Sequence, residues 1–258
     1  MLTINDPGRM PDNLKTIQDG RRPLHELYQE YKFFRHNEWE RDILYQDIAT
    51  DEEGSDIGIN LPIYAFRTKI RRAVGKSLFL IFGIHGEEPA GPNALVENMA
   101  VMEDMRKKGI PMVIVPVANP NGYWKDWRMS DARRNHDGFG ASVGSSEHLL
   151  PHRTNPDKSR MEKSECPQAD AITRAMLEYA ERYRPFMVLD FHEDEHIVGI
   201  DGPPEDENAY IYSQGELGVN DPIAQRIVKI LEEQGFQLQK RKTTRWDEPI
   251  VNGIVSNP

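Results

Sequence analysis

Cysteine is almost absent from this sequence, because Cys166 is the only one among 258 residues. An intramolecular disulfide is therefore excluded, and so is a metal site built on several thiolates. Long apolar runs are also missing, and without about 18 consecutive apolar residues we expect no membrane-spanning helix. The segment Met1–Pro7 lacks the basic and apolar regions of a secretion signal. The expectation that follows is a cytoplasmic location.

Basic residues are in the minority, with 32 Lys and Arg against 42 Asp and Glu, which gives a formal net charge of −10. Nucleic-acid-binding proteins normally carry a basic patch, so we expect no nucleic-acid partner. The charge says little about a small substrate, because a local pocket can oppose the net charge. No pattern in the sequence specifies an oligomeric state.

Short apolar runs alternate along the chain with longer segments whose apolar residues have helical spacing. The candidate strands are Ile43–Tyr45, Leu61–Arg67, Leu78–Phe82, Met112–Val117 and Phe186–Phe191. The candidate helices are Pro92–Lys108, Ala171–Arg184 and Pro222–Gln234. This alternation predicts an α/β fold with parallel strands, covered by helices on both faces. The candidate strands Leu78–Phe82, Met112–Val117 and Phe186–Phe191 are expected to be buried on both faces of the sheet. We expect an N-terminal extension over residues 1–40, with a short helix near His25, and a domain over residues 41–258.

The segment H-G-E-E-P-A-G, from His85 to Gly91, lies where a buried strand ends and a helix begins. Ligands of open α/β sheets bind at such junctions. His85 and Glu88 offer an imidazole and a carboxylate, which are ordinary zinc ligands and can converge on one ion. The alternative is an acidic helix N-terminus, at which Glu87 and Glu88 only favour the helix dipole.

His192 follows the last of the candidate strands and completes a possible set of three ligands. A catalytic zinc site has three protein ligands and an open position, so the sequence predicts one Zn²⁺ held by His85, Glu88 and His192. Asp190 is expected to orient a ligand from behind, or to bond to the backbone at the end of the strand. A rival motif, H-E-x-x-H from His192 to His196 with Glu193 as base, needs a continuous helix. The preceding strand and the following glycines and prolines oppose it.

With these segments in place, the chain resembles the zinc metallocarboxypeptidases and their succinylglutamate desuccinylase-like relatives, above all the small bacterial carboxypeptidase-like proteins. The resemblance covers about residues 75–255 and rests on H-G-E-E-P-A-G, on N-P-N-G-Y from Asn119 to Tyr123, and on D-F-H from Asp190 to His192. It implies a mixed, largely parallel central sheet with helices on both faces. It also implies hydrolysis of a peptide or amide bond by zinc-activated water, with a small peptide or an N-acyl amino acid as substrate.

The family places an arginine after the N-P-D-G turn to bind the substrate carbonyl or the oxyanion. The resemblance assigns this role to Arg133 or Arg134, with Arg128 as the second choice and Asn135 as a substrate-binding residue. A guanidinium suits the role because it stays charged and offers several donors. The alternative for Arg133 and Arg134 is a solvated pair in a loop.

Two features depart from the family pattern. No Asn-Arg pair follows in residues 140–148, so recognition of a free C-terminal carboxylate is left open. The family's general base is a glutamate on a late strand, for which Glu248 is the only late candidate, and we expect the domain to lack its last strand. The remaining alternatives are an N-acyl amino-acid amidohydrolase and an inactive zinc-binding protein or fragment.

Overall fold

A computed structural model of the chain describes residues 2–3, 20–35, 38–51, 54–70, 76–128, 130, 166–192, 211–213, 217–236, 249–252 and 254–256. The chain divides into two compact units, Met1–Asp194 and Glu195–Pro258. The first unit contains the predicted metal ligands, so the fold is described mainly there.

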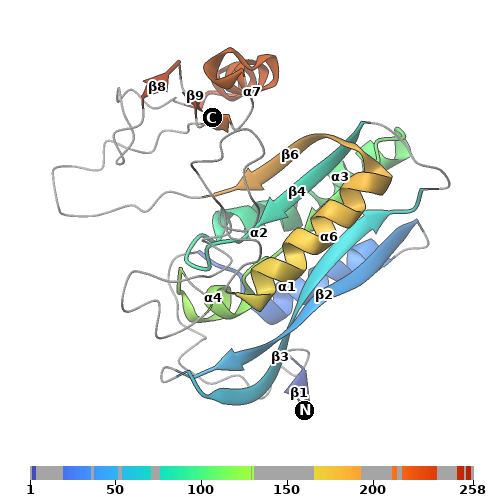
Figure 1. The fold of residues 1–258 in the computed structure, drawn as a ribbon, viewed down its shortest axis with the longest axis vertical. Helices are drawn as coiled ribbons and strands as arrows, with labels where there is room; N and C mark the ends of the chain where they lie inside the picture. The colour runs from blue at the N-terminus through green and yellow to red at the C-terminus, as the bar shows by residue number, and fades with distance from the viewer. Residues whose placement is uncertain are drawn as a thin grey trace, which may run out of the picture. The chain divides into compact units, whose positions relative to one another are not determined.

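The first unit is built on a six-stranded sheet (Figure 1). Its strands are β1 (Leu2–Thr3), β2 (Trp39–Thr50), β3 (Asp56–Thr68), β4 (Ser77–Phe82), β5 (Met112–Val115) and β6 (Pro185–Phe191). The order is β1-β3-β5-β4-β6, with β2 paired to β3. β4 is parallel to both β5 and β6, whereas β3 is antiparallel to β2 and to β5. The predicted mixed α/β sheet is therefore confirmed.

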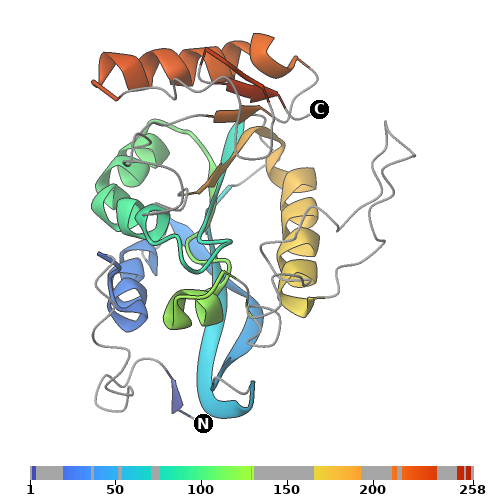
Figure 2. The same cartoon turned by 90° about the vertical axis from the view of Figure 1, so that its left-hand side faces the viewer.

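Helices cover both faces of this sheet. In Figure 2, α6 (Pro167–Tyr183, yellow) lies on one side, and α1 (Leu24–Glu30), α2 (Ala90–Glu97) and α3 (Met99–Lys107) lie on the other. Side chains alternate between the faces along β4, as in any pleated strand. Leu78, Leu80 and Phe82 belong to the core on the α1–α3 side, whereas Phe79 belongs to the core under α6.

The segment predicted as one helix over residues 92–108 is two helices, α2 and α3, which meet at Asn98. The Asn98 side chain donates a hydrogen bond to the carbonyl of Ala94 at 2.8 Å. Asparagine interrupts helices in this way because its amide competes for backbone partners. Leu95 in α2 and Met99 in α3 are buried in the core.

Residues 20–35 pack into the core of the first unit. The predicted short helix is α1, and a 3₁₀ helix, η3 (Tyr31–Arg35), follows it. Leu27, Tyr31 and Phe34 are almost completely buried in the same core as the α2 and α3 side chains. The domain boundary at residue 40 stays a prediction.

β6 differs from the expectation of a strand buried on both faces. Phe186 and Val188 are 50% and 54% exposed, whereas Met187 and Leu189 pack against the core on the α1–α3 side. The reason is the position of β6 at the edge of the sheet, where β4 is its only partner strand in the described part of the chain. An apolar run therefore does not by itself distinguish a central strand from an edge strand.

The second unit contains β7 (Ile211–Ser213), a 3₁₀ helix η5 (Gly218–Asn220), α7 (Pro222–Glu233), β8 (Ile250–Val251) and β9 (Ile254–Ser256). β9 pairs in parallel with β7 and antiparallel with β8. The Asp221 carboxylate caps α7 by accepting hydrogen bonds from the amides of Ile223 and Ala224 at 2.7 and 3.2 Å.

In the described ranges, no helix is long and apolar enough to span a membrane.

Candidate metal centre

The pairing of β4 with β6 brings together two segments that are distant in the sequence, at the carboxyl ends of the two strands. Ile81 pairs with Asp190 and Phe82 with Phe191, in parallel register. The residues that immediately follow these two strands therefore emerge side by side. His85 lies in the loop between β4 and α2, and His192 directly follows β6. The predicted ligands meet because their strands are neighbours in the sheet.

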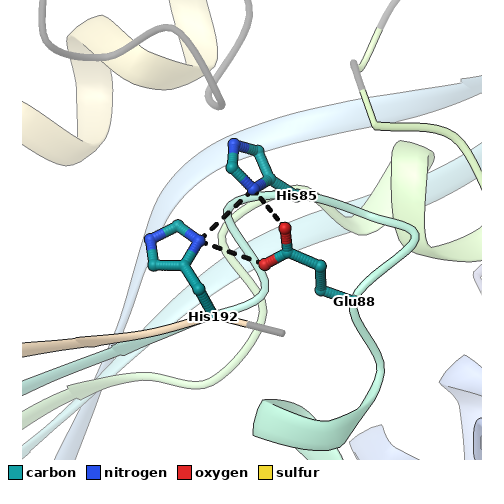
Figure 3. A group of neighbouring side chains, drawn as sticks. All are labelled: His85, Glu88 and His192. Atoms are coloured by element: carbon teal, nitrogen blue, oxygen red, sulfur yellow. Dashed lines mark hydrogen bonds and ion pairs between the residues drawn. The ribbon is translucent and has the colours of Figure 1, made fainter. Parts of the chain in front are cut away.

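His85, Glu88 and His192 form a compact group (Figure 3). One ligand atom from each residue lies within 4.8 Å of the others. Nδ1 of His192 lies 3.0 Å from Oε2 of Glu88 and 3.3 Å from Nδ1 of His85, and Nδ1 of His85 lies 2.6 Å from Oε1 of Glu88. Ligand atoms that share one tetrahedral zinc ion lie roughly 3.3 Å apart. The two separations from His192 are close to this value, whereas the separation of His85 from Glu88 is that of a short hydrogen bond.

The charges of this group also suit a cation. Burial acts to raise the pKa of Glu88, but its hydrogen bonds with His192 and His85 outweigh burial and lower the pKa to about 2. Burial acts to lower the pKa of His192, but the hydrogen bonds with Asp190 and Glu88 raise it to about 10. In this arrangement a proton on His192 balances the carboxylates. A metal ion must displace that proton, because only the neutral imidazole nitrogen is a ligand.

Asp190 lies behind His192. Its Oδ2 atom is 2.8 Å from Nε2 of His192, on the side of the ring away from Glu88. A carboxylate on the distal nitrogen of a ligating histidine fixes the tautomer and the orientation of the ring. The structure thus leaves Nδ1 of His192 as the nitrogen that faces the other two ligands.

The loop that carries His85 and Glu88 packs directly against α4 (Pro120–Lys125), which contains most of the N-P-N-G-Y segment. A Cβ atom built at Gly86 would overlap the backbone of Gly122, Tyr123 and Trp127. Gly86 is therefore required by a close approach of two backbones, in accordance with the ordinary use of glycine at such places.

The asparagines of N-P-N-G-Y hold the chain that leaves α4. Asn119 caps the helix by accepting a hydrogen bond from the amide of Gly122 at 3.0 Å, and its Nδ2 donates to the carbonyl of Arg128 at 3.1 Å. Asn121 donates to the carbonyl of Ser130 at 2.7 Å. These bonds fix the backbone from which the Arg128 side chain projects.

Arg128 reaches the candidate ligands. Its Nη1 atom donates to Oε1 of Glu87 at 2.7 Å and lies 3.4 Å from Oε1 of Glu88. The side chain is 34% exposed, so the guanidinium is held at the site and is still accessible. Arg128 is the second choice that the family resemblance offers for the oxyanion, and its position just after N-P-N-G-Y is the signal for it.

The other predicted functional residues lie outside the described part of the chain. This holds for Arg133, Arg134, Asn135 and Glu248, and for Glu193 and His196 of the rival H-E-x-x-H motif. Their roles stay predictions.

Solved structures with a similar fold include proteins of Shewanella provisionally assigned as metallopeptidases. The protein from Shewanella denitrificans has a TM-score of 0.61 at 17% identity, with 91% of this chain and 72% of that chain covered. The protein from Shewanella baltica has a TM-score of 0.62 at 16% identity, with 91% and 75% covered. A metallo-carboxypeptidase from Pseudomonas aeruginosa, solved with (2-guanidinoethylmercapto)succinic acid, has a TM-score of 0.50 at 16% identity, with 86% and 52% covered.

Comparisons of the sequence alone are less informative, since no model of a protein family matches it and no curated protein matches it either. The likeness to the solved structures is a likeness of fold, because the identities are low. At the level of the fold, the resemblance to metallopeptidases and metallo-carboxypeptidases is confirmed.

Proposed function

We propose that this protein is a zinc-dependent hydrolase of peptide or amide bonds, similar to a metallocarboxypeptidase. The observation that supports this most strongly is the convergence of His85, Glu88 and His192, whose ligand atoms lie within 4.8 Å of one another at the ends of two neighbouring strands. Two imidazoles and one carboxylate are a common ligand set of catalytic zinc in peptidases. The metal-dependent peptidases among the proteins of similar fold support the same reading.

His85, Glu88 and His192 would hold one zinc ion, and Asp190 would keep Nδ1 of His192 directed at it. A bound zinc ion supplies Lewis-acid polarisation of a carbonyl group and activates water for hydrolysis. The exposed His192 ring is the open side of the group, since His85 and Glu88 are buried. A substrate would therefore approach from the side of His192.

Arg128 is the residue we assign to the oxyanion. Its guanidinium is held by Glu87 and can donate to a carbonyl oxygen that gains negative charge during the reaction. Arg133 and Arg134 are the alternatives for this role. Asn135 as a substrate-binding residue and Glu248 as the general base complete the proposal.

We propose the substrate class from the proteins of similar fold and from the sequence. A small peptide cleaved at its C-terminal residue is the first choice, because a metallo-carboxypeptidase is among the proteins of similar fold. An N-acyl amino acid is the second choice, because residues 140–148 contain no Asn-Arg pair for a C-terminal carboxylate.

The test is a zinc-dependent assay with a substrate panel. The protein is stripped of metal with a chelator, reloaded with one equivalent of zinc, and offered N-blocked dipeptides that end in Lys, Arg or Phe. C-terminally amidated dipeptides and N-acyl amino acids complete the panel, and the His85→Ala variant is the matched control.

Zinc-dependent release of the C-terminal residue, absent from His85→Ala, is the expected result. Hydrolysis of N-acyl amino acids alone would establish the amidohydrolase. Zinc binding without turnover of any substrate would contradict the enzyme, and the absence of zinc binding would overturn the whole proposal.

A further inference from the structure

Arg21 lies far from the metal ligands in the sequence, yet its side chain is directed at the loop that carries them. The guanidinium is buried, with the side chain only 6% exposed. Nη1 donates to the carbonyl of Gly86 at 3.2 Å and to the carbonyl of Tyr123, and Nη2 is paired with the Asp126 carboxylate. The guanidinium also lies over the Tyr123 ring, 5.1 Å from its centroid.

The acceptors of Arg21 belong to the two segments that form the candidate site. Gly86 lies between His85 and Glu88, and Tyr123 and Asp126 lie at the end of α4, from which the chain leads to Arg128. One planar guanidinium can bond to several acceptors at once in a fixed fork, which an ammonium group cannot reproduce. Arg21 thus joins the metal-ligand loop to α4.

The Gly86 carbonyl is an effective point at which to hold this loop. A side chain at residue 86 could not hold the loop in its place, because its Cβ atom would overlap the backbone of α4. The backbone of a glycine also has more conformational freedom than that of any other residue. A hydrogen bond to the Gly86 carbonyl therefore restricts the backbone between the ligand residues His85 and Glu88.

The segment around Arg21 is fixed independently of the Arg21 side chain. Asn93 in α2 donates to the carbonyl of Gly20 at 2.9 Å and accepts from the amide of Arg22 at 3.2 Å. The Tyr123 hydroxyl donates to the carbonyl of Arg22 at 2.9 Å. A substitution at Arg21 therefore removes the guanidinium and leaves its backbone in place.

We infer that Arg21 is a positioning residue of the metal centre, which holds the His85–Glu88 loop against α4 in the geometry that binds the ion. This inference rests on the proposed function, since it presumes a metal at His85, Glu88 and His192. Residues that orient the ligands of a metal site through hydrogen bonds usually contribute about 10- to 100-fold to metal affinity. The same range is expected for Arg21.

The experiment compares Arg21→Gln with Arg22→Gln in the full chain. Arg22 is the adjacent arginine, but its side chain is 38% exposed and pairs with Glu97 at 3.3 Å, away from the ligands. Zinc affinity is measured by competition with a chromophoric chelator. The visible spectrum of the Co²⁺-loaded protein is recorded as well, because it depends on coordination geometry and not on global stability.

Arg21→Gln is expected to bind zinc about 10- to 100-fold more weakly and to alter the Co²⁺ spectrum, whereas Arg22→Gln matches the wild type. Should Arg21→Gln fail to fold, Asp126→Asn removes one charged partner, and we expect it to weaken zinc binding about two- to fivefold. Wild-type affinity and spectrum in the folded variant would overturn the role of Arg21 alone. A wild-type protein that binds no zinc would instead overturn the proposed function, and this inference with it.

Discussion

The Asp190 carboxylate contacts Nε2 of His192 at 2.8 Å, while Nδ1 of the same ring faces Glu88 at 3.0 Å. His192 is therefore held from both sides between two carboxylates. One of them belongs to the group of candidate ligands, and the other lies behind the ring. This division of the two ring nitrogens determines which atom is offered to a metal ion.

Removal of the carboxylate at Asp190 should weaken metal binding without abolishing it. We expect Asp190→Ala to lower zinc affinity by about 10- to 100-fold, because the His192 ring loses the partner that fixes its orientation. Asp190→Asn keeps an acceptor oxygen for Nε2 and should lose less. Competition titration of the three proteins measures the effect, and equal affinities would show that Asp190 has no part in the site.

Arg128 should contribute to turnover and not to metal content. If it stabilises the oxyanion, Arg128→Ala lowers kcat by about 100- to 1000-fold on whichever substrate the panel identifies. The zinc content should stay at the wild-type level, because Arg128 is not a ligand. Arg174→Ala is the control, since Arg174 is 77% exposed and pairs with Asp170 on the same helix. Undiminished kcat in Arg128→Ala would return the role to Arg133 or Arg134.

Gly86 and Gly91, from the same H-G-E-E-P-A-G segment, should respond differently to alanine. Gly86→Ala is expected to destabilise the protein by at least about 3 kcal/mol, because the new methyl group meets rigid backbone. A Cβ atom at Gly91 would lie 3.4 Å from Phe82 and 3.5 Å from Phe191, which are ordinary contacts. Gly91→Ala should therefore change stability by no more than about 1 kcal/mol. Urea unfolding measures both, and similar losses would contradict the close approach at Gly86.

Asp47 in β2 should make stability depend on pH. Its carboxyl is buried, and in the described part of the chain its Oδ2 atom has no hydrogen-bond partner. Burial raises its pKa from 3.8 to about 6, although bonds from Ile48 and Gln168 act to lower it. The folded state thus holds the proton more tightly than the unfolded chain. The stability contributed by this group is complete below pH 3.8 and is lost as the pH rises through about 6.

Asp47→Asn removes this titration. Each pKa unit corresponds to about 1.4 kcal/mol, so the variant should gain up to roughly 3 kcal/mol relative to the wild type between about pH 4 and pH 8. Free energies of unfolding from urea titrations across this range provide the measurement. A difference between the two proteins that stays constant with pH would show that Asp47 does not titrate as described.

The candidate ligands could be predicted from the sequence, because the ends of the strands can be recognised in it. Apolar runs marked the strands before His85 and His192, and adjacent parallel strands bring the residues that follow them together. The break at Asn98 and the exposure of Val188 were not visible, since they depend on a side-chain hydrogen bond and on the order of strands.

Arg21 could not be predicted from the sequence. Two of its acceptors are backbone carbonyls, at Gly86 and Tyr123, and a carbonyl gives no signal in the residue type that carries it. Only the packing of residues 20–35 into the core of the first unit brings this arginine to the loop. Arg128 could be predicted as a second choice, because it follows the N-P-N-G-Y segment in the sequence.

The zinc content of the purified protein tests the central claim most directly. After reconstitution with zinc and extensive dialysis, elemental analysis should find one zinc ion per wild-type chain. The His85→Ala and His192→Ala variants, shown to be folded by circular dichroism, should contain almost none. One zinc ion per chain in both folded variants, or no zinc in the wild type, would contradict a metal centre at His85, Glu88 and His192.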